Sequence, residues 1–416
     1  MGMTMIEKIL ARAAGRPAVA PGDLVDVAVD TCVPIDMNFI SALWRPVRHV
    51  WDPDKVVVIF DHIVPAKDVQ TATALQTGRE FVKRFGITRF HDVGPEQGIC
   101  HQLIAERAYA LPGTVLVCAD SHTCSGGAFN CAARGIGGPE LLYVLTKGRT
   151  WFQVGETVRY VLEGTVPPIV TAKDIFLHIA GTFGDHATRN VEFVGPAVTA
   201  MTLDARRTLA TMCAEISAEF ATFEADQKVV EHCRARTART FAPQVSDPDA
   251  RFAAVRTIDV GRLEPLVAFP DTVVHNARPV KEAAGVAIDQ AFIGSCANGT
   301  LDDLAVAARV VKGRKVASTV RFIVTPGSQA IYREALKQGL VATLVEAGAL
   351  VTTSSCGACA GLQNGALGPK ERCITASTRN FKGRMGADDA EIFMGSPATV
   401  AASAIRGSIA DPREFL

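Results

Sequence analysis

The chain has few tryptophans and tyrosines, 3 and 4 among 416 residues, and it has no excess of charge of either sign. Lys and Arg together number 43, and Asp and Glu also number 43. A chain without a net charge has no general attraction for nucleic acid or for an acidic membrane surface. No apolar run reaches the roughly 18 consecutive residues that a membrane-spanning helix needs. We therefore expect a globular protein that binds neither nucleic acid nor a membrane.

Cysteine is better represented, and the number of cysteines is informative. The eleven cysteines are odd in number and scattered along the chain. This distribution is awkward for a secreted protein with a disulfide framework, but it is acceptable in a reducing compartment. We expect a cytoplasmic protein in which most of these thiols are small, buried core residues.

Short β-rich runs alternate with segments of helical spacing, which is typical of parallel βαβ units. From this alternation we expect α/β architecture: three α/β domains with mainly parallel sheets around a central cleft, covering residues 1–155, 156–275 and 276–416. The segment 225–256 is polar and is predicted to be a surface helix followed by a loop. Strands are predicted at 55–60, 114–119, 290–293, 320–325, 350–353, 372–375 and 391–394, and helices at 72–85, 173–180, 206–220, 328–338 and 398–405.

Polar clusters follow several of these predicted strands at the point where each strand ends. Open α/β sheets bind their ligands at the carboxyl ends of the strands, so side chains at these positions are candidates for a functional site. The same side chains in the middle of helices would mean much less. The clusters are Asp61-His62, Asp120-Ser121-His122, Ser295-Cys296, Cys356 with Cys359, and Thr378-Arg379-Asn380.

Three thiols stand out among these clusters. Cys356 and Cys359 are two residues apart, and Cys296 lies 60 positions before Cys356. Three thiolates around one point suit an iron–sulfur cluster and leave one iron open to substrate. A zinc site would want a second Cys-x-x-Cys, which the chain lacks, and a redox pair or simple burial remain alternatives from spacing alone.

Seven short motifs, in the same order along the chain, give a more specific reading. The sequence resembles the aconitase superfamily, and in length it is similar to the large-subunit group of two-subunit 3-isopropylmalate dehydratases and homoaconitases. The motifs are FDHIVP at 60–65, GICHQ at 98–102, ADSHT at 119–123, FIGSCANG at 292–299, CGACAG at 356–361, STRNFKGR at 377–384 and GSPATV at 395–400.

This resemblance implies that Cys296, Cys356 and Cys359 hold a [4Fe–4S] cluster, whose open iron acts as a Lewis acid. It also implies catalytic acids and imidazoles that move the proton of the leaving hydroxyl, and arginines that bind carboxylates bidentately. Read without the resemblance, the acids could be turn caps at strand ends, His101 a core histidine, and Glu215 a charge on a helix face. The implied catalytic set is Asp61, His62, His101, Asp120 and His122, and the implied substrate-binding set is Ser121, Glu215, Arg379 and Arg384.

Three positions depart from what the resemblance leads us to expect. Thr211 and Thr378 stand where the family usually has asparagine, and Val29, just before Asp30, stands where relatives carry glutamine or histidine. Threonine keeps a hydroxyl but loses reach, and valine loses the donor entirely. These changes could alter substrate choice, cluster potential or activity.

The expected function is that of a hydro-lyase that dehydrates and rehydrates a hydroxy di- or tricarboxylate. 3-Isopropylmalate, in leucine biosynthesis, is the first expectation, with homoaconitate, 2-methylmalate and dimethylmalate as alternatives. In the family the proton-abstracting serine belongs to a separate swivelling domain that no stretch of this chain matches, so we expect a small-subunit partner in a heterodimer or heterotetramer. The non-enzyme alternatives are a degenerate paralogue and an RNA-binding regulator; the zero net charge argues against the latter.

Overall fold

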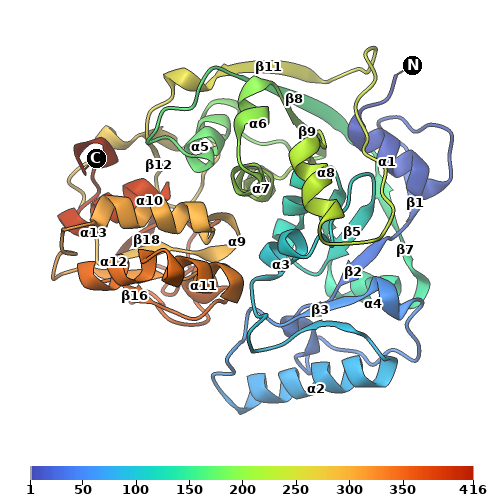
Figure 1. The fold of residues 1–416 in the computed structure, drawn as a ribbon, viewed down its shortest axis with the longest axis horizontal. Helices are drawn as coiled ribbons and strands as arrows, with labels where there is room; N and C mark the ends of the chain where they lie inside the picture. The colour runs from blue at the N-terminus through green and yellow to red at the C-terminus, as the bar shows by residue number, and fades with distance from the viewer. Residues whose placement is uncertain (1, 416) are drawn as a thin grey trace. The chain divides into compact units, whose positions relative to one another are not determined.

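A computed structural model describes residues 2–415, which form two compact units. Unit 1 takes the chain up to Gly94, then Cys100–Gly164 and His186–Asp259. Unit 2 takes Pro95–Ile99, Thr165–Asp185 and the chain from Val260 onward. Each unit therefore combines segments that are distant in sequence (Figure 1). The division into three domains at 155/156 and 275/276 stays a prediction.

The sheets of unit 1 are short and mostly parallel. β2 (Thr31–Val33), β5 (Val115–Cys118) and β6 (Ala132–Gly135) form a parallel sheet in the order β2-β5-β6, and β3 (Val57–Ile59) pairs in parallel with β4 (Arg89–His91). A bridge between Ile35 and Ile59 joins the two sets. The other sheets are the antiparallel pair β1 (Leu24–Ala28) with β7 (Arg149–Gln153), and a parallel four-stranded sheet in the order β10 (Ala221–Phe223), β9 (Arg189–Val194), β8 (Glu156–Glu163) and β11 (Ala254–Asp259).

The helices of unit 1 begin and end where the sequence provides caps. The Thr4 side chain accepts the Glu7 amide at the start of α1, and Gly15 ends that helix in the left-handed conformation, as a C-terminal glycine commonly does. Asp68 caps the start of α2 by accepting the Thr71 amide. The unit contains α1 (Met5–Ala14), α2 (Val69–Phe85), α3 (Cys100–Glu106), α4 (Gly138–Lys147), α6 (Pro196–Ala200), α7 (Leu203–Met212) and α8 (Gln227–Arg234), with 3-10 turns η1 (Asp36–Phe39), η2 (Pro53–Lys55), η3 (Ser121–Phe129) and η4 (Cys213–Ile216).

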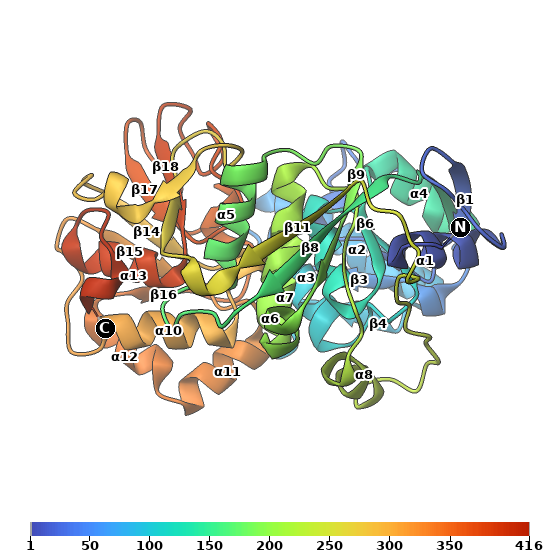
Figure 2. The same cartoon turned by 90° about the horizontal axis from the view of Figure 1, so that it is seen from above.

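Unit 2 is built on one seven-stranded sheet, whose central strands are buried and apolar, as parallel strands covered on both faces are. Figure 2 shows these strands side by side. The order is β13 (Ala277–Pro279), β12 (Leu266–Ala268), β18 (Glu391–Gly395), β17 (Arg372–Thr375), β14 (Gln290–Ile293), β15 (Arg321–Val324) and β16 (Leu350–Val351), and only the pairs made by β12 are antiparallel.

The helices of unit 2 alternate with these strands. Thr300 caps α10 with a capping box, and Ser396 caps α13, which has proline in its first turn. The helices are α5 (Ala172–Phe183), α9 (Ser295–Asn298), α10 (Leu301–Val311), α11 (Gln329–Lys337), α12 (Leu340–Ala347) and α13 (Pro397–Arg406), with 3-10 turns η5 (Val260–Arg262), η6 (Val280–Glu282), η7 (Gly357–Ala360) and η8 (Pro412–Phe415). None of the helices among the described residues is long and apolar enough to cross a membrane.

The expected α/β fold with mainly parallel sheets is confirmed, and two local predictions were wrong. The helix predicted at 206–220 ends at Met212, and a 3-10 turn follows that closes on Ser217 in the left-handed conformation. The loop predicted within 225–256 instead ends in strand β11, which begins at Ala254 and pairs with β8. β11 is a short strand in a polar stretch, and most of its residues are exposed or half-buried. Its extended conformation is therefore stabilised by pairing with β8.

Candidate active site

In unit 1, three aspartates follow strands that run in the same direction. Asp36 comes after β2, Asp61 after β3 and Asp120 after β5. β2 and β5 are parallel neighbours, and the bridge from Ile35 to Ile59 places the end of β3 beside the segment that follows β2. The carboxyl ends of parallel strands meet at one edge, which explains why these side chains lie together.

Asp61 and His62 form a hydrogen-bonded pair within this group. One carboxylate oxygen of Asp61 lies 2.7 Å from His62 Nδ1, and the other accepts the amide of Cys100 at 2.8 Å. The other ring nitrogen of His62, Nε2, lies 3.4 Å from a carboxylate oxygen of Asp120. The imidazole of His62 therefore lies between two carboxylates, an arrangement that can hold and pass a proton.

Asp120 is the hub of the imidazole contacts. His101 Nε2 lies 2.6 Å from its Oδ1, which also accepts the His122 amide at 2.8 Å. Burial alone would raise the pKa of Asp120, but the charge and hydrogen bond of His101, with hydrogen bonds from His122 and His62, hold the pKa well below its usual 3.8. His101 is buried, and its Nδ1 has no hydrogen-bond partner among the described residues.

The remaining predicted residues of unit 1 flank this hub. His122 Nε2 lies 2.7 Å from Glu215 Oε1. Burial lowers the pKa of His122, but hydrogen bonds with Asp120 and Glu215 outweigh it, so the pKa rises above its usual 6.5. Glu215 belongs to the 3-10 turn η4, while Ser121 is exposed beside Asp120. The hydroxyl of Thr211 donates to the Arg207 carbonyl one helical turn back, at 2.7 Å.

Asp36 is not among the residues predicted from the sequence, where the only position noted in this segment was Val29, just before Asp30. Asp30 accepts the Val115 amide at 2.8 Å and pairs with Arg12, and Val29 is a buried core residue. Asp36 is buried and accepts the amides of the turn that carries Asp61 and His62. The rule that identified Asp61, namely a polar residue just past a strand end, would also have identified Asp36 after β2.

In unit 2, the predicted residues gather at the carboxyl edge of the seven-stranded sheet. Cys296 follows β14, Cys356 and Cys359 follow β16, and Arg379 follows β17, all strands of one parallel set. The three thiols are all buried. Ser295 starts α9 with a φ of 70°, which turns the chain sharply from β14 into the helix that carries Cys296.

Cys359 has an environment that favours a thiolate. Its Sγ lies 3.7 Å from an Arg384 guanidinium nitrogen and 3.5 Å from the Thr378 hydroxyl oxygen. The hydrogen bond with Cys356 lowers the pKa of Cys359 most, burial opposes it, and Arg384 and Thr378 lower it further, so the pKa falls well below its usual 9.0. Thr378 thus reaches a thiol that is predicted to be a ligand, although its side chain is shorter than that of asparagine.

The two predicted arginines, Arg379 and Arg384, both lie near the ring of Phe381. The guanidinium carbon of Arg379 is 6.0 Å from the ring centre of Phe381, and that of Arg384 is 5.9 Å from it. Two further contacts support the surrounding loops. Gln97 Nε2 donates to the Ser354 carbonyl at 2.6 Å, and the buried Lys173 Nζ donates to the Ser377 carbonyl at 2.9 Å.

The thiols at this edge of the sheet fit an iron–sulfur cluster by their chemistry. Three buried thiols are the ligands that such a cluster takes, and one of them already favours the thiolate. The hydroxyls of Ser354 and Ser355, next to Cys356, are buried without a hydrogen-bond partner in the described part of the chain. Buried hydroxyls are normally bonded, so these two are available to donate to a group held by the thiols.

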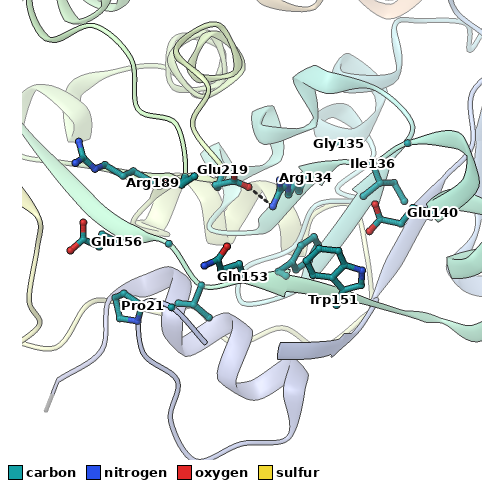
Figure 3. A pocket seen from close by; sticks show the side chains of 16 residues that line it. Pro21, Arg134, Gly135, Ile136, Glu140, Trp151, Gln153, Glu156, Arg189 and Glu219 are labelled. Atoms are coloured by element: carbon teal, nitrogen blue, oxygen red, sulfur yellow. Dashed lines mark ion pairs between the residues drawn. The ribbon is translucent and has the colours of Figure 1, made fainter. Parts of the chain in front are cut away.

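A pocket of unit 1 lies behind the Asp120 turn and contains none of the predicted site residues. Its volume is about 600 Å³, and Gly135 in its wall packs against the backbone of Asp120 and Ser121. Figure 3 shows Arg134 and Glu219 pointing toward one another in an ion pair within the pocket. A side chain at position 135 would collide with this turn, so the close packing of the Asp120 turn requires glycine there.

Comparison with known proteins agrees with this arrangement. The model of the aconitase family (aconitate hydratase) matches residues 37–285 and 272–407. This chain belongs to the aconitase family. It is 51% identical over 416 residues to a 3-isopropylmalate dehydratase large subunit from Mycolicibacterium smegmatis, covering 100% of this chain and 98% of that protein.

Two further relatives and one solved structure extend the comparison. The chain is 44% identical to a large subunit 1 of the same name from Methanopyrus kandleri, covering 100% of both, and 42% identical to a probable methanogen homoaconitase large subunit from Methanothermobacter thermautotrophicus, covering 99% and 98%. Holo-form aconitase X from Thermococcus kodakaraensis is similar in fold, with a TM-score of 0.52, 12% identity and 88% of each chain covered.

Proposed function

We propose that this chain is the large subunit of an iron–sulfur hydro-lyase of the 3-isopropylmalate dehydratase type. The reaction converts 2-isopropylmalate to 3-isopropylmalate by loss of water, through an enoate, and re-addition of water at the neighbouring carbon. The names of relatives up to 51% identical over the whole chain support this assignment. The enzyme would act in leucine biosynthesis, and a cytoplasmic location stays a prediction.

The observation that carries the proposal is the setting of Cys359. A buried thiol with a lowered pKa, beside a second thiol and an arginine, suits both a cluster ligand and a carboxylate site. Cys296, Cys356 and Cys359 would hold a [4Fe–4S] cluster. When bound, such a cluster supplies a Lewis acid for the hydroxyl and carboxylate of the substrate.

The chain's own residues would divide the remaining work. Arg379 and Arg384 would bind substrate carboxylates, because a guanidinium fork matches a carboxylate bidentately. In the dehydration a C–O bond and a C–H bond break, and the hydroxyl leaves as water after it gains a proton. The imidazole of His101, held on Asp120, would supply that proton and take it back on rehydration.

The proton lost from carbon needs a base that we do not assign to this chain. We propose that a serine on a small-subunit partner supplies it, in a heterodimer or heterotetramer. The relatives are named as large subunits, which supports a partner of this kind. The chain alone should therefore bind a cluster without turning over substrate.

A second candidate is the large subunit of a homoaconitase. The relative from Methanothermobacter thermautotrophicus, 42% identical over 99% of this chain, favours it. Dehydratases acting on 2-methylmalate or dimethylmalate are further alternatives within the same chemistry. The partner subunit would largely decide among these substrates.

The test is anaerobic reconstitution of the chain with iron and sulfide, followed by addition of the small subunit. We expect a bound cluster by iron and sulfide analysis and electron paramagnetic resonance, and turnover of 2-isopropylmalate only with both subunits. The Cys296→Ser variant should lose both. Turnover of homoaconitate alone would select the second candidate, and a parent chain that binds no iron would contradict the hydro-lyase assignment.

A further inference from the structure

Asp36 is a buried carboxylate that hydrogen-bonds the backbone of two candidate active-site residues, Asp61 and His62. Within residues 2–415, no hydrogen bond joins it to the residues predicted to bind substrate. It begins η1 just after β2, and its exposed fraction is 0%. The amide of Ile59 donates to the Pro34 carbonyl, and Ile35 bridges to Ile59. These contacts hold Asp36 directly opposite the end of β3, where the chain turns into Asp61 and His62.

A single oxygen of Asp36 organises that turn. Its Oδ2 accepts three consecutive backbone amides, from Asp61 at 3.0 Å, His62 at 2.9 Å and Ile63 at 2.8 Å. Successive amides that converge on one oxygen form a nest, a concave backbone shape that binds anions. The other oxygen accepts the Met37 amide at 2.9 Å. The carboxylate is thus occupied by backbone donors on both sides.

The turn held in this way sets the position of an imidazole. His62 extends from it with Nδ1 at 2.7 Å from Asp61 and Nε2 at 3.4 Å from Asp120. Asp120 in turn bonds His101. A displacement of the 61–63 backbone by about 1 Å would break the alignment of both carboxylates on His62, and misplacement of that size can cost about 100-fold in rate.

We propose that Asp36 is a positioning residue of the active site, which holds the 61–63 turn so that His62 lies between Asp61 and Asp120. The proposal rests on the proposed function for its kinetic consequences. Asp36 does not itself touch substrate, because its side chain is fully buried and both of its oxygens accept backbone amides.

Charge supports the same role. Asp61 and His62 are the titratable groups that face Asp36, with His62 Nδ1 at 3.7 Å from its second oxygen. Burial, and next the charge of Asp61, raise the pKa of Asp36 to about 7, while His62 and the turn amides lower it. Ionised Asp36 stabilises positive charge on the imidazole of His62, and this stabilisation is lost in Asp36→Asn.

Two variants separate positioning from folding. Asp36→Ala removes every acceptor of the turn, and kcat should fall about 100-fold with KM nearly unchanged. Asp36→Asn keeps one acceptor oxygen for the three amides but removes the charge. Its kcat should fall about 10-fold, and the acid limb of its kcat/KM profile should move to lower pH. Asp30→Asn, which also loses a carboxylate that accepts a backbone amide, is the matched control and should behave as the parent.

A measurement on the large subunit alone completes the test. Hydrogen exchange of the 60–64 segment should quicken at least about 10-fold in Asp36→Ala while the remainder of unit 1 stays protected. Unchanged exchange there, exchange that rises throughout unit 1, or an Asp36→Asn enzyme with parental kcat and pH profile would each overturn the proposal. If the parent complex fails to turn over 2-isopropylmalate, the proposed function fails, and the exchange result still decides the role of Asp36.

Discussion

The two units differ in whether the polar groups of their candidate sites are hydrogen-bonded within the protein. In unit 1, imidazoles and carboxylates hold one another, with His62 between Asp61 and Asp120 and His101 on Asp120. In unit 2, the loop that carries Cys356 leaves the hydroxyls of Ser354 and Ser355 buried without a partner among the described residues.

The difference indicates what each region is built for. The acids and imidazoles of unit 1 are paired with one another, apart from the buried Nδ1 of His101, and such a network can hold a proton. A thiol loop with unbonded hydroxyls is incomplete by itself, because buried polar groups are normally satisfied. The first arrangement suits acid–base chemistry, and the second suits the binding of a cofactor. Variants in unit 1 should therefore lose turnover but keep iron, whereas variants in the thiol loop should lose both.

The largest effect should come from the thiol loop. Cys356→Ser removes a proposed ligand of the cluster, so bound iron should fall to near zero and turnover by at least about 1,000-fold. Iron analysis and the activity of the reconstituted complex measure both. Cys373→Ser is the matched control, since Cys373 is also buried and packs in the same apolar cluster. Parental iron content in Cys356→Ser would show that the ligand assignment is wrong.

In unit 1, Asp120→Asn should leave iron binding intact and lower kcat about 1,000-fold, because His101 and His62 lose their shared carboxylate. The parent's lowered Asp120 pKa also predicts a pH effect on stability. This carboxylate stabilises the fold above its unfolded pKa near 3.8, and the contribution is lost as pH falls through the lower folded value. Thermal unfolding followed from about pH 5 down to about pH 2 should thus show a smaller acid loss in Asp120→Asn. A variant that also loses iron would remove the contrast between the units.

A smaller effect should follow from Gly135→Ala. An added Cβ would meet the Asp120 carbonyl and approach Ser121 Cα to 2.9 Å, so the turn that carries Asp120 must move. We expect kcat to fall about 100-fold with the fold retained. Gly138→Ala, three residues later, meets nothing within 4 Å and serves as the control. Equal activity of both variants would mean that the turn tolerates displacement.

The smallest effect should come from Arg384→Lys. Lysine keeps the charge beside Cys359 but loses the planar fork, so KM should rise about 10-fold with iron content unchanged. Arg372→Lys, whose side chain forms an exposed pair with Glu391, is the control. If Arg384→Lys clearly lowers the melting temperature together with the rise in KM, Arg384 stabilises the loop and does not bind substrate.

The sequence predicted those features that depend on short segments. The strands predicted at 290–293 and 372–375 have the observed bounds, since each is a short β-rich segment with a mostly buried centre. The strand-end rule predicted the carboxyl-edge placement of Asp61, Asp120 and the thiols. It could not supply the partners, because the pairing of His62 with Asp120 or of His122 with Glu215 depends on contacts between segments distant in sequence.

The missed features share a physical cause. β11 lies in a polar stretch, and its strand conformation comes from its register with β8, which no local pattern reveals. Asp36 was missed because β2 lies between Asp30 and Pro34 and lacks the longer apolar run that surrounds β3, although the two strands have the same length. The roles of Gln97 and Lys173 in supporting the loops of unit 2 likewise depend on contacts at long sequence separation.

The packing beneath the thiols has a practical consequence for handling the protein. Cys356 and Cys359 lie in an apolar cluster with Phe292, Leu367 and Met385, so the loop has a core of its own. Apolar burial keeps such a loop folded without any metal. Purified chain that has lost its proposed cluster in air should therefore keep this loop folded. Iron and sulfide added later should reconstitute the cluster without a refolding step.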